Sequence, residues 1–362
     1  MKIEVSIIST WDIRCGIAEY SKLLSKELES LEPVNISICP IKKPNSTNLF
    51  YFLKLMSQVK NPHIIHIQYQ GSIFGHLPIP HFSYSYFPLL ILAIRLLKKS
   101  KIIATIHDFR FDSKQDILKL KFLDLSDKLI VHTKKLAEML ISGGISDKKI
   151  AIIPIGTPKG EILDKEECKR RLGVEGKRIL TIFGFVHENK GHDLLINVLP
   201  KLGQDVVLLI AGAPRLKEHE SYYNSLKEAA SSLGVKDRVK FLGFIKAENL
   251  PIIFNATDIA IYPYREIAAS AALHFALGYQ IPVIASDLDY FKEIKEEYEC
   301  VELFEKDNEN DLYRKIRELL LDKIKRYYLK KKSGEFYEKT NWRRVAEKHK
   351  ELYLNLLAES RM

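Results

Sequence analysis

The chain has 362 residues and an apolar fraction of 46%, which together predict two packed domains and exclude an intrinsically disordered protein. Its net charge of +10 is concentrated in residues 1–160, where 22 Lys and Arg stand against 13 Asp and Glu. A basic half suits phosphates, anionic lipids or nucleic acid as partners, or it is simply a solvated surface. No RNA-binding, Cys/His-finger or basic-zipper pattern accompanies the charge, so no nucleic-acid partner is expected.

The first half of the chain alternates short β-branched runs with longer helical patterns, the rhythm of βαβ units with parallel strands. We expect strands at residues 4–9, 35–39, 64–68, 102–106, 128–132 and 150–153. Helical patterns occupy residues 18–31, 87–97 and 133–141. Several strands are nearly continuous apolar runs, as expected where both faces of a sheet are covered.

The second half repeats this rhythm. We expect strands at residues 179–183, 206–211, 239–242, 259–262, 282–285 and 300–303, with helices at 193–199, 218–233, 270–277 and 341–357. The sequence therefore predicts an α/β protein with two Rossmann-like, doubly wound domains facing across a cleft. We expect the first domain over residues 1–160, the second over residues 161–335, and a terminal helical segment over residues 336–362.

Three features bear on the compartment. Cys15, Cys39, Cys168 and Cys300 lie far apart with no C-x-x-C, which argues against disulfides or a zinc site and favours a reducing cytoplasm. The first residues carry Glu4 and lack a small-residue cleavage site, so we interpret them as a strand and not as a signal peptide. Residues 86–97 form the longest apolar stretch, which is shorter than the roughly 20 residues of a membrane-spanning helix.

Residues 89–101 join an apolar run to Arg95, Lys98, Lys99 and Lys101. This pattern is typical of an interfacial helix, which would hold the protein against the anionic inner face of a membrane. An ordinary buried helix with a basic C-terminal end fits the same pattern. Both interpretations stay open.

Ligands of open parallel sheets bind at the carboxyl ends of strands, so the residues after each strand are the first candidates for a site. After the first strand, Gly16 opens a helix whose N–H groups suit a phosphate or an acceptor hydroxyl, although a glycine there also serves a plain turn. After the fourth strand, His107 is placed to hydrogen-bond a sugar hydroxyl; the alternative is a histidine that satisfies loop carbonyls. The histidines at positions 63, 66, 76 and 81 match no metal-ligand spacing, so no metal site is expected.

A lysine follows the strand at residues 179–183. Lys190 lies in the loop from Gly184 to Gly191 and is placed to direct a positive charge at a leaving diphosphate. Departure of a nucleoside diphosphate builds up negative charge, so a positioned cation lowers that barrier.

The densest candidate segment covers residues 262–274. Its loop carries Arg265 and Glu266, and a helix of small residues begins near Ser270. Successive N–H groups at such a helix start form an anion-binding nest. Ser270 is also a good N-cap, and small residues also permit tight packing against a sheet. We interpret the segment as phosphate-binding, because Lys190 would then face the same cleft.

Taken together, these segments resemble the large GT-B family of retaining glycosyltransferases, the family-four or group 1 type that includes sucrose synthases and bacterial mannosyltransferases. The resemblance runs over nearly the whole chain, and its specificity lies in the order and spacing of the segments. The matching segments are G-I-A-E-Y-S from residue 16, residues 66–75, 105–108, 126–132, 153–156, 183–191, 242–244, 256–265 and 281–287, and the last helix with Trp342.

The resemblance implies a cytoplasmic enzyme of cell-envelope glycan synthesis. Its second domain would bind a UDP- or GDP-sugar as donor substrate, its first domain a glycan or lipid-linked acceptor, and its last helix would cross back to the first domain. Retention would follow front-face attack, with the departing phosphate helping to deprotonate the acceptor. No cofactor and no metal are expected, because cationic side chains and backbone amides replace the metal and no counterpart of the metal-binding aspartate pair is found.

The resemblance also implies roles for individual residues. Gly16 and Ile17 would lie near the donor phosphates and the acceptor, His107 at the donor sugar, and Lys190 with its Gly184 loop at the diphosphate. The remaining implied contacts are the backbone of Phe244 and Ile245 at the base, and the amides of Ser270, Ala271 and Ala272 at the distal phosphate. We group His107, Lys190, Arg265 and Glu266 as catalytic candidates.

Several positions depart from the family pattern. Phe185 stands where the family usually carries an arginine, and Gln280 where it usually carries a glycine. The family's two glutamates, eight positions apart, would fall at Ile267 and Phe275; Glu266 lies one place from the first. A subgroup with a Tyr-Arg loop in place of the first glutamate fits best, with Arg265 supplying the cation missing at position 185.

Three hypotheses follow. The first is transfer of a hexose from a nucleotide sugar to a hydroxyl of the acceptor. The second is a non-catalytic GT-B-like subunit that binds a nucleotide or an anionic polymer, motivated by the phenylalanines at positions 185 and 275. The third is a sugar-nucleotide epimerase, which would need a pair of acid–base carboxylates that the sequence does not offer.

Overall fold

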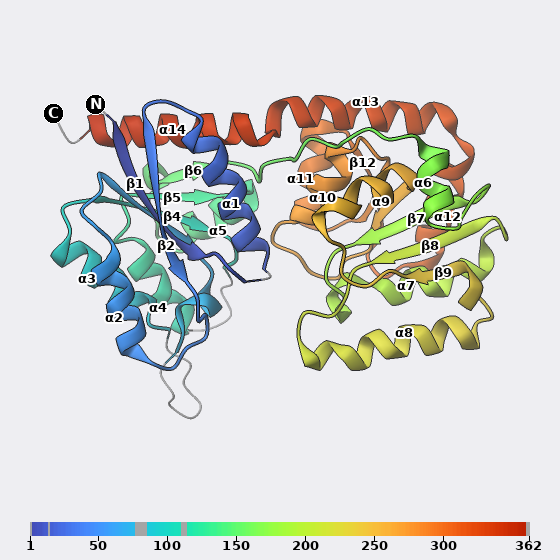
Figure 1. Cartoon of the computed structure of the whole chain (residues 1–362), viewed down its shortest axis with the longest axis horizontal. Helices are drawn as coiled ribbons and strands as arrows, with labels where there is room; N and C mark the ends of the chain where they lie inside the picture. The colour runs from blue at the N-terminus through green and yellow to red at the C-terminus, as the bar shows by residue number, and fades with distance from the viewer. Residues whose placement is uncertain (1, 14, 77–84, 110–113, 360–362) are drawn as a thin grey trace. The chain divides into compact units, whose positions relative to one another are not determined.

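The computed structural model describes residues 2–13, 15–76, 85–109 and 114–359. The chain divides into two compact units (Figure 1). Unit 1 comprises Met1–Gly156 together with Thr340–Met362, and unit 2 comprises Thr157–Lys339. Unit 1 is thus built from two separate stretches of the chain.

Unit 1 contains a six-stranded parallel sheet with the order β2-β1-β3-β4-β5-β6. The strands are β1 (Ile3–Thr10), β2 (Val34–Ile41), β3 (Ile64–Tyr69), β4 (Lys101–Ile106), β5 (Lys128–Val131) and β6 (Ile150–Ile152). They are short and rich in Ile and Val, and β3 is buried at every position, because helices cover both faces of the sheet.

One face of this sheet is covered by α2 (Leu49–Gln58), α3 (Phe87–Leu97), α4 (Lys114–Leu123) and α5 (Lys134–Ser142). Apolar residues of these four helices share a single core cluster with strand residues. The helices α1 (Gly16–Glu29) and α14 (Trp342–Ala358) pack against each other in the same unit. The terminal helix therefore completes unit 1, with Trp342, Val345, Tyr353 and Leu356 buried.

Unit 2 contains a second six-stranded parallel sheet with the order β12-β11-β10-β7-β8-β9. Its strands are β7 (Arg178–Phe183), β8 (Val206–Ala211), β9 (Val239–Phe241), β10 (Ile259–Tyr262), β11 (Val283–Ser286) and β12 (Val301–Phe304). Residues of α7 (His192–Val198), α8 (Glu220–Ser232) and α12 (Glu309–Leu321) join one core cluster. Residues of α9 (Leu250–Ala256), α10 (Ala271–Gly278) and α11 (Asp289–Tyr298) join another.

The prediction of two doubly wound parallel sheets is confirmed, and each expected strand forms within one or two residues of its expected ends. Seven helices had not been anticipated: α2, α4, α6 (Lys165–Arg171), α9, α11, α12 and α13 (Lys323–Thr340). Some are too short to form alone and depend on packing against a sheet. The longest, α13, is so densely charged that its sequence shows no clear apolar stripe. Among the described residues, no helix is both long and apolar enough to cross a bilayer.

Candidate functional site

The sheet order of unit 2 defines where a ligand is expected to bind. The strands β7 and β10 are neighbours in the middle of the sheet. From β7 the chain adds β8 and β9 on one side, and from β10 it adds β11 and β12 on the other. In doubly wound sheets, ligands bind outside the carboxyl ends of the strands at this switch point. The loops that follow β7 and β10 carry Lys190, Arg265, Glu266 and Ser270, so the structure brings these four candidates to one place within unit 2.

Backbone contacts hold the two loops together. The backbone N–H of Arg265 donates to the carbonyl oxygen of Asn189 over 2.8 Å. Gly191 has a left-handed backbone with φ of 67°, and a Cβ there would lie 2.0 Å from the carbonyl oxygen of Pro263. Only glycine therefore fits at this crossing of the two loops.

The Lys190 ammonium lies over an aromatic ring. Its Nζ is 3.6 Å from the ring centroid of Tyr264, which is the geometry of a cation–π interaction. Burial lowers the pKa of Lys190 to about 7. A lysine in this state gains its proton readily when an anion approaches. No sequence pattern indicated Tyr264 as the partner of this lysine.

Arg265 is held by carboxylates of its own unit. Its guanidinium donates to both carboxylate oxygens of Asp193, over 2.9 and 2.6 Å, and to Asp307 over 2.7 Å. These bonds raise the pKa of Arg265, and the bond to Asp193 has the largest effect. Burial by itself would raise the pKa of Asp193, but its hydrogen bonds, including those to Arg265, lower it overall. Arg265, which was predicted to supply the positive charge missing at Phe185, thus has its own charge paired with two carboxylates.

A second cation lies beside that phenylalanine. The guanidinium carbon of Arg215, in the loop after β8, is 5.9 Å from the ring centroid of Phe185. Arg215 is exposed and forms no ion pair with any described residue. Nothing in the local sequence pattern distinguished it, because the contact joins loops thirty residues apart.

The start of α10 combines a cap with close backbone packing. The Ser270 hydroxyl accepts the N–H of Leu273 over 3.2 Å and caps the helix, as the N-cap interpretation requires. A Cβ added to Gly184 would lie 3.6 Å from the Cβ of Ala272, so the β7 loop runs beside the first turn. The first-turn amides, including that of Ala271, have no partner within the helix and suit an anion.

Glu266 is exposed and accepts a hydrogen bond from Asn189 over 3.2 Å.

Phe244 and Ile245 lie farther along the same edge of the sheet. They follow β9, which β8 separates from β7. Phe244 is 50% exposed, and the preceding Gly243 has a left-handed backbone with φ of 68°. The structure therefore places this pair apart from the Lys190 loop.

The two departures at positions 275 and 280 have structural counterparts. The Phe275 ring stacks on Phe254 with an interplanar angle of 2° and meets Phe183 edge-on at 5.6 Å. An aromatic cluster thus occupies the position at which the sequence resemblance expected the family's second carboxylate. Gln280 has φ of 54°, a left-handed backbone that explains why a glycine is usual there.

The candidates of unit 1 lie around α1 and β4. The Cys15 sulfur accepts the N–H of Ala18 over 3.3 Å and caps α1, while Gly16 is exposed with open space around it. Ile17 is buried, so only its backbone is available to a ligand. One turn later, the ring of Tyr20 packs edge-on against His107 with 4.9 Å between centroids.

Both ring nitrogens of His107 have partners inside unit 1. Nε2 is 2.8 Å from the side-chain oxygen of Gln68, and Nδ1 is 3.4 Å from Nε2 of His132. Burial lowers the pKa of His107 well below its usual value, and the neighbouring His132 and His66 lower it further. His107 is therefore neutral and its ring is fixed in place.

This contact extends into a buried network. His66 bonds the Tyr353 hydroxyl over 2.7 Å and the Thr105 hydroxyl over 2.7 Å, and His349 lies 3.4 Å from the Tyr20 hydroxyl. The other histidines of residues 63–81 lie elsewhere: the backbone N–H of Glu4 donates to His63, the backbone of His76 donates to Ser46, and His81 lies outside the described residues. No local sequence pattern indicated this network, because its members are up to 329 positions apart.

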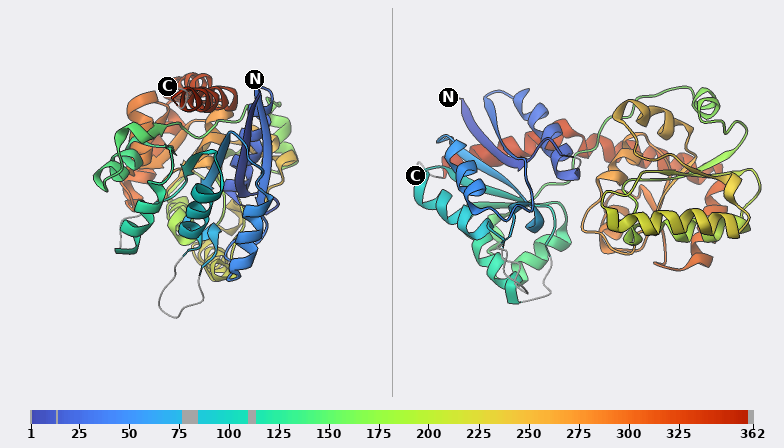
Figure 2. Two further views of the ribbon diagram at one scale, coloured as in Figure 1. Left: turned by 90° about the vertical axis from the view of Figure 1, so that its left-hand side faces the viewer. Right: turned by 60° about the horizontal axis from the view of Figure 1, so that its bottom comes forward.

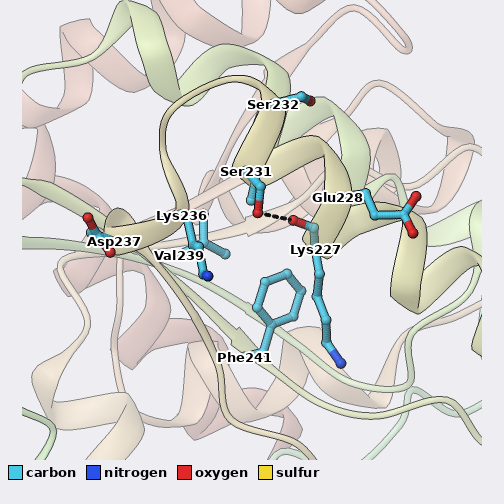
Figure 3. Close-up of a pocket in the computed structure, with 9 residues that line it drawn as sticks. Lys227, Glu228, Ser231, Ser232, Lys236, Asp237, Val239 and Phe241 are labelled. Atoms are coloured by element: carbon cyan, nitrogen blue, oxygen red, sulfur yellow. Dashed lines mark hydrogen bonds between the residues drawn. The ribbon is translucent and has the colours of Figure 1, made fainter.

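A pocket of about 730 Å³ lies elsewhere on unit 2, between α8 and β9 (Figure 3). Its charged lining residues are Lys227, Glu228, Lys236 and Asp237. The two positive and two negative charges favour neither an anion nor a cation. None of the sequence-predicted site residues lines this pocket, so we assign it no role in the site.

Comparisons with known proteins indicate the family and the fold that this chain resembles. Residues 164–336 match the family model described as glycosyl transferases group 1. The chain is 34% identical over 150 residues to a mannosylfructose-phosphate synthase of Agrobacterium fabrum, a match that covers 38% of this chain and 33% of that protein. It is 28% identical over 193 residues to spore coat protein SA of Bacillus subtilis, covering 51% of this chain and 50% of that protein. The matches thus span half or less of these relatives.

The fold is shared over the whole chain. The structure of HepE from Anabaena in complex with UDP and glucose has a TM-score of 0.80 at 14% identity, covering 98% of this chain and 100% of that one. A sucrose-phosphate synthase of Thermosynechococcus elongatus has a TM-score of 0.76 at 17% identity, covering 99% and 100%. The two sheets are those of the GT-B fold. Residues 164–336 match the model of the group 1 glycosyltransferases, the family that the sequence resembles.

Proposed function

We propose that this chain is an enzyme that transfers a hexose from a UDP- or GDP-sugar to a hydroxyl of a glycan or lipid-linked acceptor. The observation that carries the proposal is the Lys190 ammonium, stacked on Tyr264 beside the first turn of α10 at the switch point of unit 2. A cation whose pKa is lowered to about 7 and a set of helix-start amides are suited to a diphosphate. HepE, which shares the fold, has been solved with UDP and glucose.

In this proposal the bond between the anomeric carbon and the diphosphate oxygen breaks, and the acceptor oxygen bonds to the same face of that carbon. The acceptor proton passes to the departing phosphate. Lys190 and the amides of Ser270–Ala272 stabilise the negative charge on the nucleoside diphosphate, and Arg215 adds charge at the position where Phe185 supplies none. Arg265, paired with Asp193 and Asp307, acts as a positioning residue for the Lys190 loop.

In unit 1 we propose that His107 orients the donor sugar as a neutral group. Gly16 and Ile17 present backbone N–H groups to the donor phosphates or the acceptor, and Phe244 and Ile245 contact the base through their backbone. Metal independence is part of the proposal, because fixed positive charge at the diphosphate replaces a divalent ion.

A panel of UDP- and GDP-sugars tests this function. Binding by calorimetry, slow hydrolysis of one donor, and transfer to glycan or polyprenol-linked acceptors with the configuration kept at the anomeric carbon are expected. Activity should persist in excess EDTA; its loss, with recovery on adding Mg²⁺ or Mn²⁺, would refute metal independence. If no donor is bound or cleaved, the proposal fails.

The aromatic cluster at Phe275 favours one alternative, a subunit that binds the nucleotide without catalysis. Tight nucleotide binding without hydrolysis or transfer, with every acceptor of the panel, would identify that case.

A further inference from the structure

Helix α3 of unit 1 is apolar on both its inner and its outer face. Leu90, Ile91 and Ile94 point into the core, as expected. The outer face carries Leu89, Leu92, Leu96 and Leu97, which are 47%, 37%, 82% and 74% exposed. A helix that is apolar all round is normally buried on all sides, so the outer face of α3 lacks a covering partner within the described residues.

Helix α2 lies beside α3 and extends this surface (Figures 1 and 2). Phe52 of α2 packs its ring on Tyr86 at 5.4 Å, and the Lys98 ammonium donates to the carbonyl oxygen of Val59 over 2.7 Å. On the outer side of α2, Phe50 is 79% exposed and Leu53 is 45% exposed. We call the outer sides of α2 and α3, with these six apolar residues, the α2–α3 face.

The sequence around this face contains no acidic residue. Between residues 33 and 107 there is no Asp or Glu, whereas Lys42, Lys43, Lys54, Lys60, Arg95, Lys98, Lys99 and Lys101 are present. These eight positive charges nearly account for the chain's net charge of +10. Arg95 and Lys101 pair with Asp127. Lys54, Lys60 and Lys99 are exposed and form no ion pair with any described residue.

We infer that the α2–α3 face docks on an anionic lipid bilayer. Large apolar side chains with unpaired lysines on these helices (Lys54) or just after their ends (Lys60 and Lys99) are the combination that inserts shallowly among lipid headgroups while binding their phosphates. A second copy of the chain fits less well, because a face without carboxylates repels its own image across a two-fold axis. The exposed leucines thus favour the interfacial interpretation of residues 89–101, because an ordinary buried helix would not expose them. The inference rests on no step of the proposed reaction.

Co-sedimentation of the full-length chain with vesicles tests this inference in the absence of any nucleotide sugar. One set of vesicles is phosphatidylcholine alone and the other contains phosphatidylglycerol. Binding is expected only with the anionic vesicles. It should weaken as salt rises from about 0.1 M to about 1 M, since the Debye length falls from roughly 10 to 3 Å.

Matched variants separate this face from the rest of unit 1. Leu89→Asp should weaken binding about tenfold or more, because a leucine is withdrawn from the lipid and a charge of the same sign as the lipid is added. Leu354→Asp is its control, since Leu354 is 43% exposed on α14. Lys99→Glu should likewise lose about tenfold, whereas Lys348→Glu, an exposed lysine of α14, should lose far less.

Circular dichroism and the midpoint of thermal unfolding verify that each variant is folded. Equal binding to neutral and anionic vesicles, or equal losses for Leu89→Asp and Leu354→Asp, would overturn the inference. So would sedimentation of a dimer that Leu89→Asp dissociates, together with no vesicle binding, since the occupant of the face would then be a second copy.

Discussion

Lys190 combines a lowered pKa with a cation–π contact, and this pairing has a measurable consequence. Burial favours the neutral amine, with a pKa of about 7, while Tyr264 and an arriving diphosphate favour the ammonium. The proton is therefore taken up on binding whenever the pH is above 7. Lysine and arginine differ at such a position, because arginine stays protonated at every pH of interest.

Nucleoside-diphosphate affinity is accordingly expected to fall by up to about tenfold per pH unit as the pH rises above 7, because one proton is bound with the ligand. Lys190→Arg should flatten this dependence, and Lys190→Ala should lower kcat about 10²–10³-fold with a smaller change in KM. Calorimetry with UDP and GDP between pH 6 and 9 measures the first effect. An identical pH profile in wild type and Lys190→Arg would remove Lys190 from the site.

Arg265 and Asp193 form a bidentate pair that ties the loop after β10 to the first turn of α7. Both side chains are about a third exposed, so solvent screens part of the interaction. A double-mutant cycle of Arg265→Gln and Asp193→Asn should give a coupling free energy of about 1 kcal/mol in urea unfolding. Additive single effects would show that the pair does not stabilise the loops. The control is the same double-mutant cycle on another bidentate pair of unit 2, with Arg178→Gln and Asp205→Asn.

At the scale of elements, the loop after β7 depends on a glycine at its crossing with the Pro263 loop. Gly191 and Gly234 have nearly the same backbone, with φ of 67° and 65°. A Cβ at Gly191 would lie 2.0 Å from the Pro263 carbonyl oxygen, whereas a Cβ at Gly234 meets nothing within 4 Å. Both alanine variants share the left-handed strain of about 1 kcal/mol, and only one adds a clash.

Gly191→Ala is therefore expected to destabilise unit 2 by about 2 kcal/mol more than Gly234→Ala, and to weaken nucleotide binding as well. Urea unfolding followed by circular dichroism and calorimetry of the two variants measure both effects. Equal losses of stability would mean that the two loops separate easily and do not hold Lys190 in place.

The buried histidines of unit 1 act together on its stability. Burial lowers the pKa of His132 and of His349 to about 4 and that of His66 well below its usual value. In the unfolded chain these groups titrate near 6.5, so below that pH the unfolded state binds more protons than the folded state. The free energy of unfolding should then fall as the pH is lowered from about 6.5 to about 4, by several kcal/mol in total.

Intrinsic fluorescence isolates this effect, because both tryptophans, Trp11 and Trp342, lie in unit 1. Urea titrations at pH 7.5 and pH 5 measure it. A His349→Gln variant should show a shallower dependence, since glutamine does not titrate. If stability is the same at both pH values in the wild type, the histidines are not held neutral by burial.

On the scale of the whole molecule, unit 1 is assembled from two ends of the chain. A Cβ added to Gly156 would lie only 2.1 Å from the ring of Trp342, so α14 packs directly against this glycine. The Tyr353 hydroxyl of α14 also bonds His66 of β3. Truncation after residue 340 should therefore destabilise unit 1 and leave unit 2 folded. Limited proteolysis with mass spectrometry should show rapid cleavage within residues 2–156 and protection of residues 165–339. Asn341→Ala, which removes the N-cap of α14, should cost about 1 kcal/mol and leave both units resistant. Equal resistance of both units after truncation would contradict the packing.

The sequence by itself determined the twelve strands, seven of the helices and the doubly wound class, because periodicity and β-branched content act between neighbours in the chain. It also marked the loops of Lys190, Arg265 and Ser270, since ligands of such sheets bind after the strands. Only the tertiary structure decided what these groups contact. Asp193 pairs with Arg265 across 72 positions, Tyr264 stacks on Lys190, and His66 meets Tyr353 across 287 positions. Desolvation and long-range pairing depend on which surfaces fold against each other, and no local pattern contains that information.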